Sequence, residues 1–218
     1  TSISLTGANT TPAAIRQSLQ RYSTWSWDHS TDLGKLKVFD FGDSVEPDSP
    51  AGELRSQKLV ANAVSQSRLT VVLGGDNSVT YAAMLGATAR LDRSALITFD
   101  AHHDLRDGVS NGSPVRRLIE QGLPGRNVTQ IGIADFSNSP EYAKRALELG
   151  VNVVPRSSLR SKSPAEIWQE VMAFHSDVDH IFVDIDVDVC DRSAVPACPA
   201  AAPGGLSADE LRQFAYLV

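Results

Sequence analysis

The 218-residue sequence is poor in several features that define large classes of proteins. It has only two cysteines, Cys190 and Cys198, too few for a disulfide framework, and no apolar run of the roughly 20 residues that span a bilayer. Twenty Lys and Arg against 26 Asp and Glu give a net charge of −6 with no basic run, which disfavours nucleic acid or a membrane as partner. The first residues also lack the pattern of a signal peptide. We therefore expect a cytoplasmic protein.

Apolar side chains, by contrast, are plentiful at 42% of the residues, enough to bury one sizeable core, so residues 1–218 are expected to form a single domain. Helix starts are visible at Thr11-Pro12, Ser163-Pro164 and Ser207. They alternate with short β-branched runs that predict strands at 37–41, 69–73, 95–99, 128–133, 151–154 and 181–186. This alternation predicts an α/β fold with a mainly parallel sheet, in which ligands bind beyond the carboxyl ends of the strands.

Acidic residues follow two of the predicted strands. After the strand at 95–99 come Asp100, His102 and Asp104, which point to one side if strand geometry persists. The run Asp184, Asp186, Asp188 shares one face of the strand at 181–186 in the same way. Either group alone is equally compatible with acids that lie in solvent or accept hydrogen bonds from the backbone.

Carboxylates buried together repel one another and lose hydration, and a divalent metal is the simplest remedy for both costs. Two such groups at the same end of a sheet therefore favour a metal site. Oxygen ligands with one imidazole suit Mn²⁺ before Zn²⁺. Five ligand candidates exceed one tetrahedral site, so two metals that activate water are expected.

A set of motifs in this order resembles the ureohydrolase family of arginases, agmatinases and formimidoylglutamases. The motifs are Thr6-Gly-Ala8, Gly74-Gly-Asp-Asn-Ser78, Asp100-Ala-His-His-Asp104, Asp184-Ile-Asp-Val-Asp-Val-Cys-Asp191 and Pro203-Gly-Gly-Leu-Ser207. The resemblance implies a three-layer α/β/α arginase-like fold and a dimanganese centre that hydrolyses a C–N bond at an amidine-type carbon. It implies that Asp100 and Asp186 bridge the metals, that His102 and Asp188 complete one of them, and that Asp104 binds the other.

Departures from the family pattern narrow the function. Asn77 stands where the family usually has a metal-binding histidine, so we expect one metal, held in part by Asn77, to be weakly bound. Ala202 stands where arginases and agmatinases place a glutamate for the substrate guanidinium. Asn77, Asp104-Leu-Arg106 and the segment 136–139 are similar to the formimidoylglutamase branch. The family's first strand and its C-terminal strand and helix are not recognised, which leads us to expect a fragment or an incompletely recorded chain.

Two further residues are candidates for substrate binding. Arg106 suits a substrate carboxylate, because a guanidinium grips a carboxylate bidentately; the alternative is that it only neutralises the nearby acids. Asn138 is equally compatible with a substrate contact and with a turn before the helix that starts at Ser139-Pro140.

The resulting prediction is a manganese-dependent hydrolase that converts N-formimidoyl-L-glutamate to L-glutamate and formamide in histidine catabolism. Asp104 is the catalytic candidate, passing a proton to the departing amine. The alternatives are an agmatinase or guanidino-acid ureohydrolase, and a non-catalytic binding protein with a weakened metal site. The predicted partner is a small-molecule substrate, and the family resemblance implies a homo-oligomer.

Overall fold

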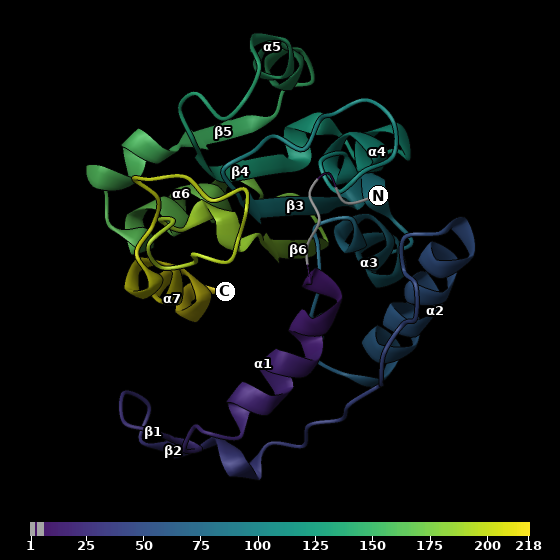
Figure 1. The fold of residues 1–218 in the computed structure, drawn as a ribbon, viewed down its shortest axis with the longest axis vertical. Coiled ribbons are helices and arrows are strands. Elements are labelled where there is room, and N and C mark those ends of the chain that lie inside the picture. Colours follow the sequence, from purple (N-terminus) through teal and green to yellow (C-terminus); the bar gives the residue numbers. More distant parts are fainter. Residues whose placement is uncertain (1–2, 4–6) are drawn as a thin grey trace.

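A four-stranded parallel sheet forms the centre of the molecule (Figure 1). The computed structural model describes Ile3 and residues 7–218, so Thr6 of the N-terminal motif lies outside the described residues. The strand order is β5-β4-β3-β6. The strands are β3 (Ser94–Phe99), β4 (Val128–Ile133), β5 (Asn152–Pro155) and β6 (His180–Ile185).

Helices cover both faces of this sheet. On one face α6 (Pro164–Phe174) and α7 (Ala208–Leu217) pack against Ile97 and Phe99 of β3. On the other face α3 (Val79–Ala87), α4 (Pro114–Glu120) and α5 (Pro140–Glu148) pack against Leu96. Alternate residues of β3 thus enter opposite cores, which is why every residue of the strand is buried. The three-layer α/β/α arrangement confirms the predicted fold class.

The remaining elements are shorter or lie beside the sheet. Two helices precede it, α1 (Thr11–Leu19) and α2 (Pro50–Gln66), and α2 packs along α3. A small antiparallel pair, β1 (Trp25–Ser26) and β2 (Thr31–Asp32), lies between them in the chain. The 3₁₀ turns are η1 (Ala8–Thr10), η2 (Leu33–Lys35), η3 (Leu91–Arg93), η4 (Gly125–Asn127), η5 (Arg156–Arg160) and η6 (Val187–Val189).

Helix starts agree with the sequence prediction. Thr11 begins α1 with proline at its second position, and Ser163 and Ser207 cap α6 and α7. Each of these two serines forms a capping box with the glutamate three residues later. Within the described part of the chain no helix is long and apolar enough to cross a membrane.

Two of the six predicted strands are wrong. Residues 37–41 and 69–73 form no strand, and Val38, Phe39 and Val71 are each more than 70% exposed. A strand needs a neighbour to complete its hydrogen bonds, and no described strand pairs with either segment. Apolar composition alone was therefore not sufficient to specify a strand.

Candidate metal centre

The candidate ligands gather where β3 and β6 end side by side. Phe99 is opposite Ile185 in the parallel register, and the chain continues from these residues to Asp100 and Asp186. The Asp186 backbone N–H donates to the Phe99 carbonyl oxygen at 2.9 Å, which joins the two strand ends. The carboxyl edge of the sheet thus brings together residues 86 positions apart, as expected for parallel strands.

Alternation of side chains along extended strands does not explain why the candidate ligands lie together, so the prediction that they share a strand face is wrong. Beyond β6 the chain tightens into η6, which contains Asp188, and the Asp186 side chain caps that turn by accepting from the Asp188 N–H at 2.9 Å. Beyond β3 the chain forms a loop in which Asp104 has a φ of +53°. Turns, rather than a common strand face, direct these side chains to one place.

Three of the predicted ligands lie together. Asp100, His102 and Asp188 each present a ligand atom within 4.8 Å of the others. His102 Nδ1 lies 2.8 Å from Asp188 Oδ2 and 3.5 Å from Asp100 Oδ1. The other Asp188 oxygen accepts from the Ala101 N–H at 3.0 Å. Asp188, which follows β6, therefore holds the loop after β3 in place.

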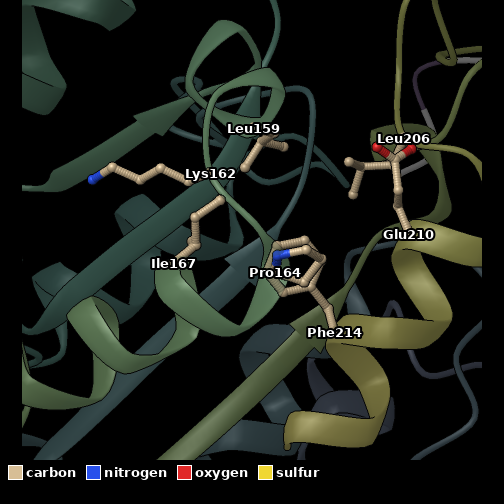
Figure 2. A pocket seen from close by; sticks show the side chains of 7 residues that line it. All are labelled: Leu159, Lys162, Pro164, Ile167, Leu206, Glu210 and Phe214. Carbon is tan, nitrogen blue, oxygen red and sulfur yellow. The ribbon is translucent and has the colours of Figure 1, made fainter.

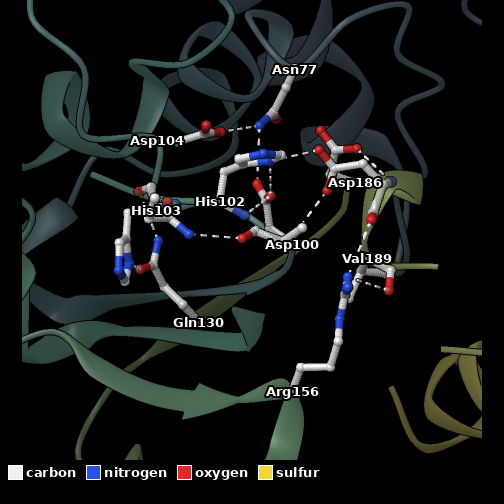
Figure 3. Close-up of polar contacts among 12 residues, drawn as sticks. Asn77, Asp100, His102, His103, Asp104, Gln130, Arg156, Asp186 and Val189 are labelled. Atoms are coloured by element: carbon white, nitrogen blue, oxygen red, sulfur yellow. Dashed lines mark hydrogen bonds and ion pairs between the residues drawn. The ribbon is translucent and has the colours of Figure 1, made fainter. Parts of the chain in front are cut away.

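Asn77 and Asp104 close the other side of the cluster (Figure 3). The Asn77 Nδ2 donates to Asp104 Oδ2 and lies 3.5 Å from Asp100 Oδ2. The Asn77 Oδ1 accepts from the Thr80 hydroxyl at 2.9 Å. The amide nitrogen therefore faces the carboxylates, and Asn77 must turn its amide over to offer oxygen to a cation. Its predicted role as a ligand stays a prediction.

Electrostatics in this cluster oppose several negative charges at once. Burial, together with the charges of neighbouring aspartates, raises the pKa of Asp100 and of Asp104 well above the ordinary value. The same causes, burial first and Asp188 second, raise the pKa of Asp186 to about 7. Each carboxyl group would be readily ionised if it were alone in water. Together in the protein they favour a bound proton or a cation.

His102 and Asp188, by contrast, stabilise each other's charged forms. Burial by itself lowers the pKa of His102, but the hydrogen bond and charge of Asp188 outweigh burial and raise it. Burial raises the pKa of Asp188, but the hydrogen bond and charge of His102 outweigh it and lower that pKa below the ordinary value. A positive charge beside Asp188 is therefore stabilised in this position.

The donor chemistry fits divalent manganese. Buried carboxylates whose mutual repulsion raises their pKa values, with one imidazole among them, form the oxygen-rich set that Mn²⁺ prefers. The compact triad Asp100, His102, Asp188 accounts for one cation position. The side containing Asp104 and Asn77 is where a second cation would bind.

Residues behind the ligands fix the loop after β3. His103 points away from the cluster, and its Nδ1 lies 2.7 Å from Gln130 Oε1, while the Gln130 amide donates to the His103 carbonyl oxygen (Figure 3). Asn138 accepts from the His103 N–H at 2.9 Å and donates to the Ala101 carbonyl oxygen at 3.0 Å. In the structure Asn138 secures the ligand loop. Its predicted contact with substrate stays a prediction.

Arg106 lies two residues beyond Asp104, with an exposed side chain. Its backbone is held by the Gly112 carbonyl oxygen at 3.0 Å and by Arg116, which donates to the Arg106 carbonyl at 2.6 Å. Among the described residues no carboxylate forms an ion pair with its guanidinium. Its predicted contact with a substrate carboxylate stays a prediction.

Comparison with known proteins shows the family to which the chain belongs. Residues 1–217 match the model of the arginase family. The chain belongs to the arginase family. The match confirms the resemblance that was inferred from the motifs.

Several similar proteins within the family are formimidoylglutamases. The chain is 37% identical to the formimidoylglutamase of Halalkalibacterium halodurans over 97% of this chain and 70% of that protein. It matches the crystal structure of Bacillus subtilis formimidoylglutamase with a TM-score of 0.91 and 34% identity, over 98% of this chain and 70% of that one. A Trypanosoma cruzi formiminoglutamase structure with two Mn²⁺ matches with a TM-score of 0.86 and 26% identity, covering 98% and 74%. The chain is thus a formimidoylglutamase-like hydrolase.

Sequence reasoning missed three residues that position the site. Thr80 donates to Asn77, Gln130 holds His103, and Arg156 donates to the backbone of η6. Gln130 had a recognisable signal, because it is the one amide side chain in β4, a strand whose residues are all buried. Thr80 lies only three residues after Asn77 but carries no motif of its own, and Arg156 had no signal, since its partner Val189 is distant in the sequence.

Proposed function

We propose that the protein hydrolyses N-formimidoyl-L-glutamate to L-glutamate and formamide with two manganese ions. The observation that carries the proposal is the meeting of Asp100, His102 and Asp188 at the carboxyl edge of the sheet in a formimidoylglutamase-like chain. Asp186 and Asp104 lie beside them with raised pKa values.

The ligands divide between two positions. Asp100, His102, Asp186 and Asp188 would hold one ion, and Asp100, Asp104 and Asp186, with weak help from Asn77, would hold the second. Bound metal supplies Lewis acidity and activates water near neutral pH. The amide of Asn77 is a poorer ligand than imidazole, so the second position is the weaker.

The chain's own side chains then place the substrate and move protons. The free guanidinium of Arg106 binds the glutamate carboxylate with two parallel hydrogen bonds. Asp104, whose pKa is raised by burial and by neighbouring aspartates, would pass a proton to the departing amine nitrogen. Asn138 and Gln130 keep the loop between these two residues and β3 in position.

Substrates with a guanidinium fit this site poorly. Ala202 provides no carboxylate to pair with such a group, and Arg106 repels a cationic tail. These two features favour formimidoylglutamate over agmatine and arginine. A cytoplasmic homo-oligomer is the accompanying proposal, and light scattering coupled to size-exclusion chromatography measures the oligomeric state.

Product analysis tests the function directly. The manganese-loaded protein should release formamide and glutamate from formimidoylglutamate and little urea from arginine or agmatine. Removal of metal with a chelator should abolish the activity, and added Mn²⁺ should restore it. A protein that binds manganese but releases none of these products would support the non-catalytic alternative instead.

A further inference from the structure

A hollow lies behind the metal centre, between η5 and the loop that leads into α7. Its volume is about 200 Å³, and its lining includes Arg156, Arg160, Gly204 and Glu210. None of these residues is a candidate metal ligand. The hollow therefore has its own chemistry, dominated by two guanidinium groups.

Arg156 reaches this hollow from the inside of the protein. It is only 8% exposed, and its Nη2 donates to the Val189 carbonyl oxygen at 3.1 Å and lies 3.5 Å from that of Asp188 (Figure 3). Its Nε is buried and has no hydrogen-bond partner, a condition shared by only one other buried side-chain atom of the described residues. An unmet donor on a buried cation is costly and calls for an acceptor.

Arg160 approaches from the surface side. It is exposed and forms no ion pair with any described carboxylate, and its Nη2 lies 3.7 Å from where a Cβ on Gly204 would stand. Glu210 is the one acid among the described residues that line the hollow. Its Oε2 accepts from both the Ser207 N–H and hydroxyl at 2.7 Å, so this carboxylate already has its donors at the start of α7.

We propose that a small oxyanion of the phosphate type binds in this hollow between Arg156 and Arg160. Guanidinium groups match oxyanions in both charge and donor geometry. A bound oxyanion would lie beside the Arg156 guanidinium and supply the counter-charge that Arg160 lacks. The contacts of Arg156 with the carbonyls of Asp188 and Val189 place this site directly behind η6.

An adjoining hollow of about 70 Å³ shows why the anion would not bind there instead (Figure 2). It shares Leu159, Leu206 and Glu210 with the first hollow and is otherwise lined by apolar side chains and Lys162. The Lys162 ammonium is already paired with both oxygens of Glu170, at 2.6 and 2.7 Å. Of the two adjoining hollows, only the one with the two arginines therefore offers positive charge that no described carboxylate pairs with.

Calorimetric titration with inorganic phosphate tests the site, against chloride at equal ionic strength. We use the protein as purified and after metal removal, together with the variants Arg160→Glu, Arg68→Glu and Arg106→Ala. Arg68 is an exposed arginine outside the hollow and is the matched control for the change of charge. Arg160 is chosen over Arg156 because its exposed side chain can change without disturbing the core.

The expected result is one saturable phosphate site that persists after metal removal and weakens at least about tenfold in Arg160→Glu. Arg68→Glu and Arg106→Ala should bind as the unmodified protein does. Phosphate should also raise the unfolding temperature of every protein except Arg160→Glu, because a ligand that binds only the folded state stabilises it. Absence of saturable binding, or binding lost with the metal or with Arg106, would overturn the proposal.

Discussion

His102 Nδ1 lies 2.8 Å from Asp188 Oδ2, and this contact joins the loop after β3 to the turn after β6. The histidine gains a raised pKa from it, and the aspartate a lowered one. A cation bound by these two side chains would replace the proton that they share in the metal-free protein. Metal binding and proton release are therefore linked in this site.

Mn²⁺ affinity should rise with pH between about 6 and 8. Metal-free Asp186, with a pKa of about 7, loses its proton within this range, and the raised pKa of His102 acts in the same direction, because both groups must be deprotonated to bind metal. Calorimetry in buffers of different ionisation enthalpy counts the protons released. A binding enthalpy that is independent of the buffer at pH 6.5 would contradict the linkage.

Asp186→Asn should remove most of the bound manganese. Asparagine keeps one oxygen to accept from the Asp188 N–H, so η6 stays capped, but it lacks the second negative oxygen needed by a bridging ligand. We expect Mn²⁺ affinity to fall by about tenfold or more. Metal analysis after dialysis measures this, with Asp177→Asn, an exposed aspartate, as control. Full metal content and activity in Asp186→Asn would disprove the ligand assignment.

The metal-free protein should lose stability as pH rises from about 4 to about 7. Burial raises the pKa of Asp184 to about 6 and that of Asp186 to about 7, both above the ordinary value of 3.8 for an aspartate. The folded state therefore binds more protons than the unfolded state in this window, and its relative stability falls as those protons are lost. The expected change is on the order of 1–3 kcal/mol.

Denaturant unfolding of the chelated protein at several pH values measures that slope. Asp184→Asn should make the slope shallower, because asparagine does not titrate. Saturating Mn²⁺ should weaken or reverse the trend, since metal binds the ionised carboxylates. A metal-free protein whose stability increases from pH 5 to pH 7 would show that these groups are not buried as described.

Asn77→His should tighten the weaker of two manganese sites. In the unmodified protein the Asn77 amide nitrogen faces Asp104, so its oxygen is not presented to a cation. We expect two classes of Mn²⁺ site in a titration and a gain of about tenfold in the weaker class for the histidine variant. Asn77→Ala is the control for loss of the amide. Two sites of equal affinity in the unmodified protein would refute this asymmetry.

The sequence was informative where short-range chemistry decides the outcome. The capped starts of α6 and α7 and the central strands followed from local patterns, because caps and apolar runs act over a few residues. It was misleading at 69–73, where an apolar run has no described neighbour with which to pair.

In the site, three of the predicted ligands, Asp100, His102 and Asp188, lie together, but the sequence did not show how they meet. The alternation argument required an extended chain through Asp188, whereas that residue lies in a 3₁₀ turn. The contact between Arg156 and the Val189 carbonyl depends on the packing of η5 against η6 and has no local signature. Long-range contacts of this kind are fixed by the complete fold rather than by any short segment.

Arg106→Lys should separate substrate binding from charge balance. If the Arg106 guanidinium holds the substrate carboxylate, lysine keeps the charge but loses the bidentate fork, so KM for formimidoylglutamate should rise more than kcat falls. The expected loss in kcat/KM corresponds to about 1.5–3 kcal/mol. Arg90→Lys, which changes an exposed arginine paired with Asp92, should leave both constants unchanged.

Steady-state kinetics on formimidoylglutamate, agmatine and arginine, with metal content measured in parallel, decide between the two roles of Arg106. If Arg106 only neutralises the acids, the lysine variant keeps its KM and any loss is in metal affinity. The proposed substrate role rests on the observation that no described carboxylate forms an ion pair with this guanidinium. Urea release from arginine at a rate equal to formamide release would refute both this role and the argument from Ala202. Arg106 is expected to repel a guanidinium substrate, and Ala202 provides no carboxylate to bind one.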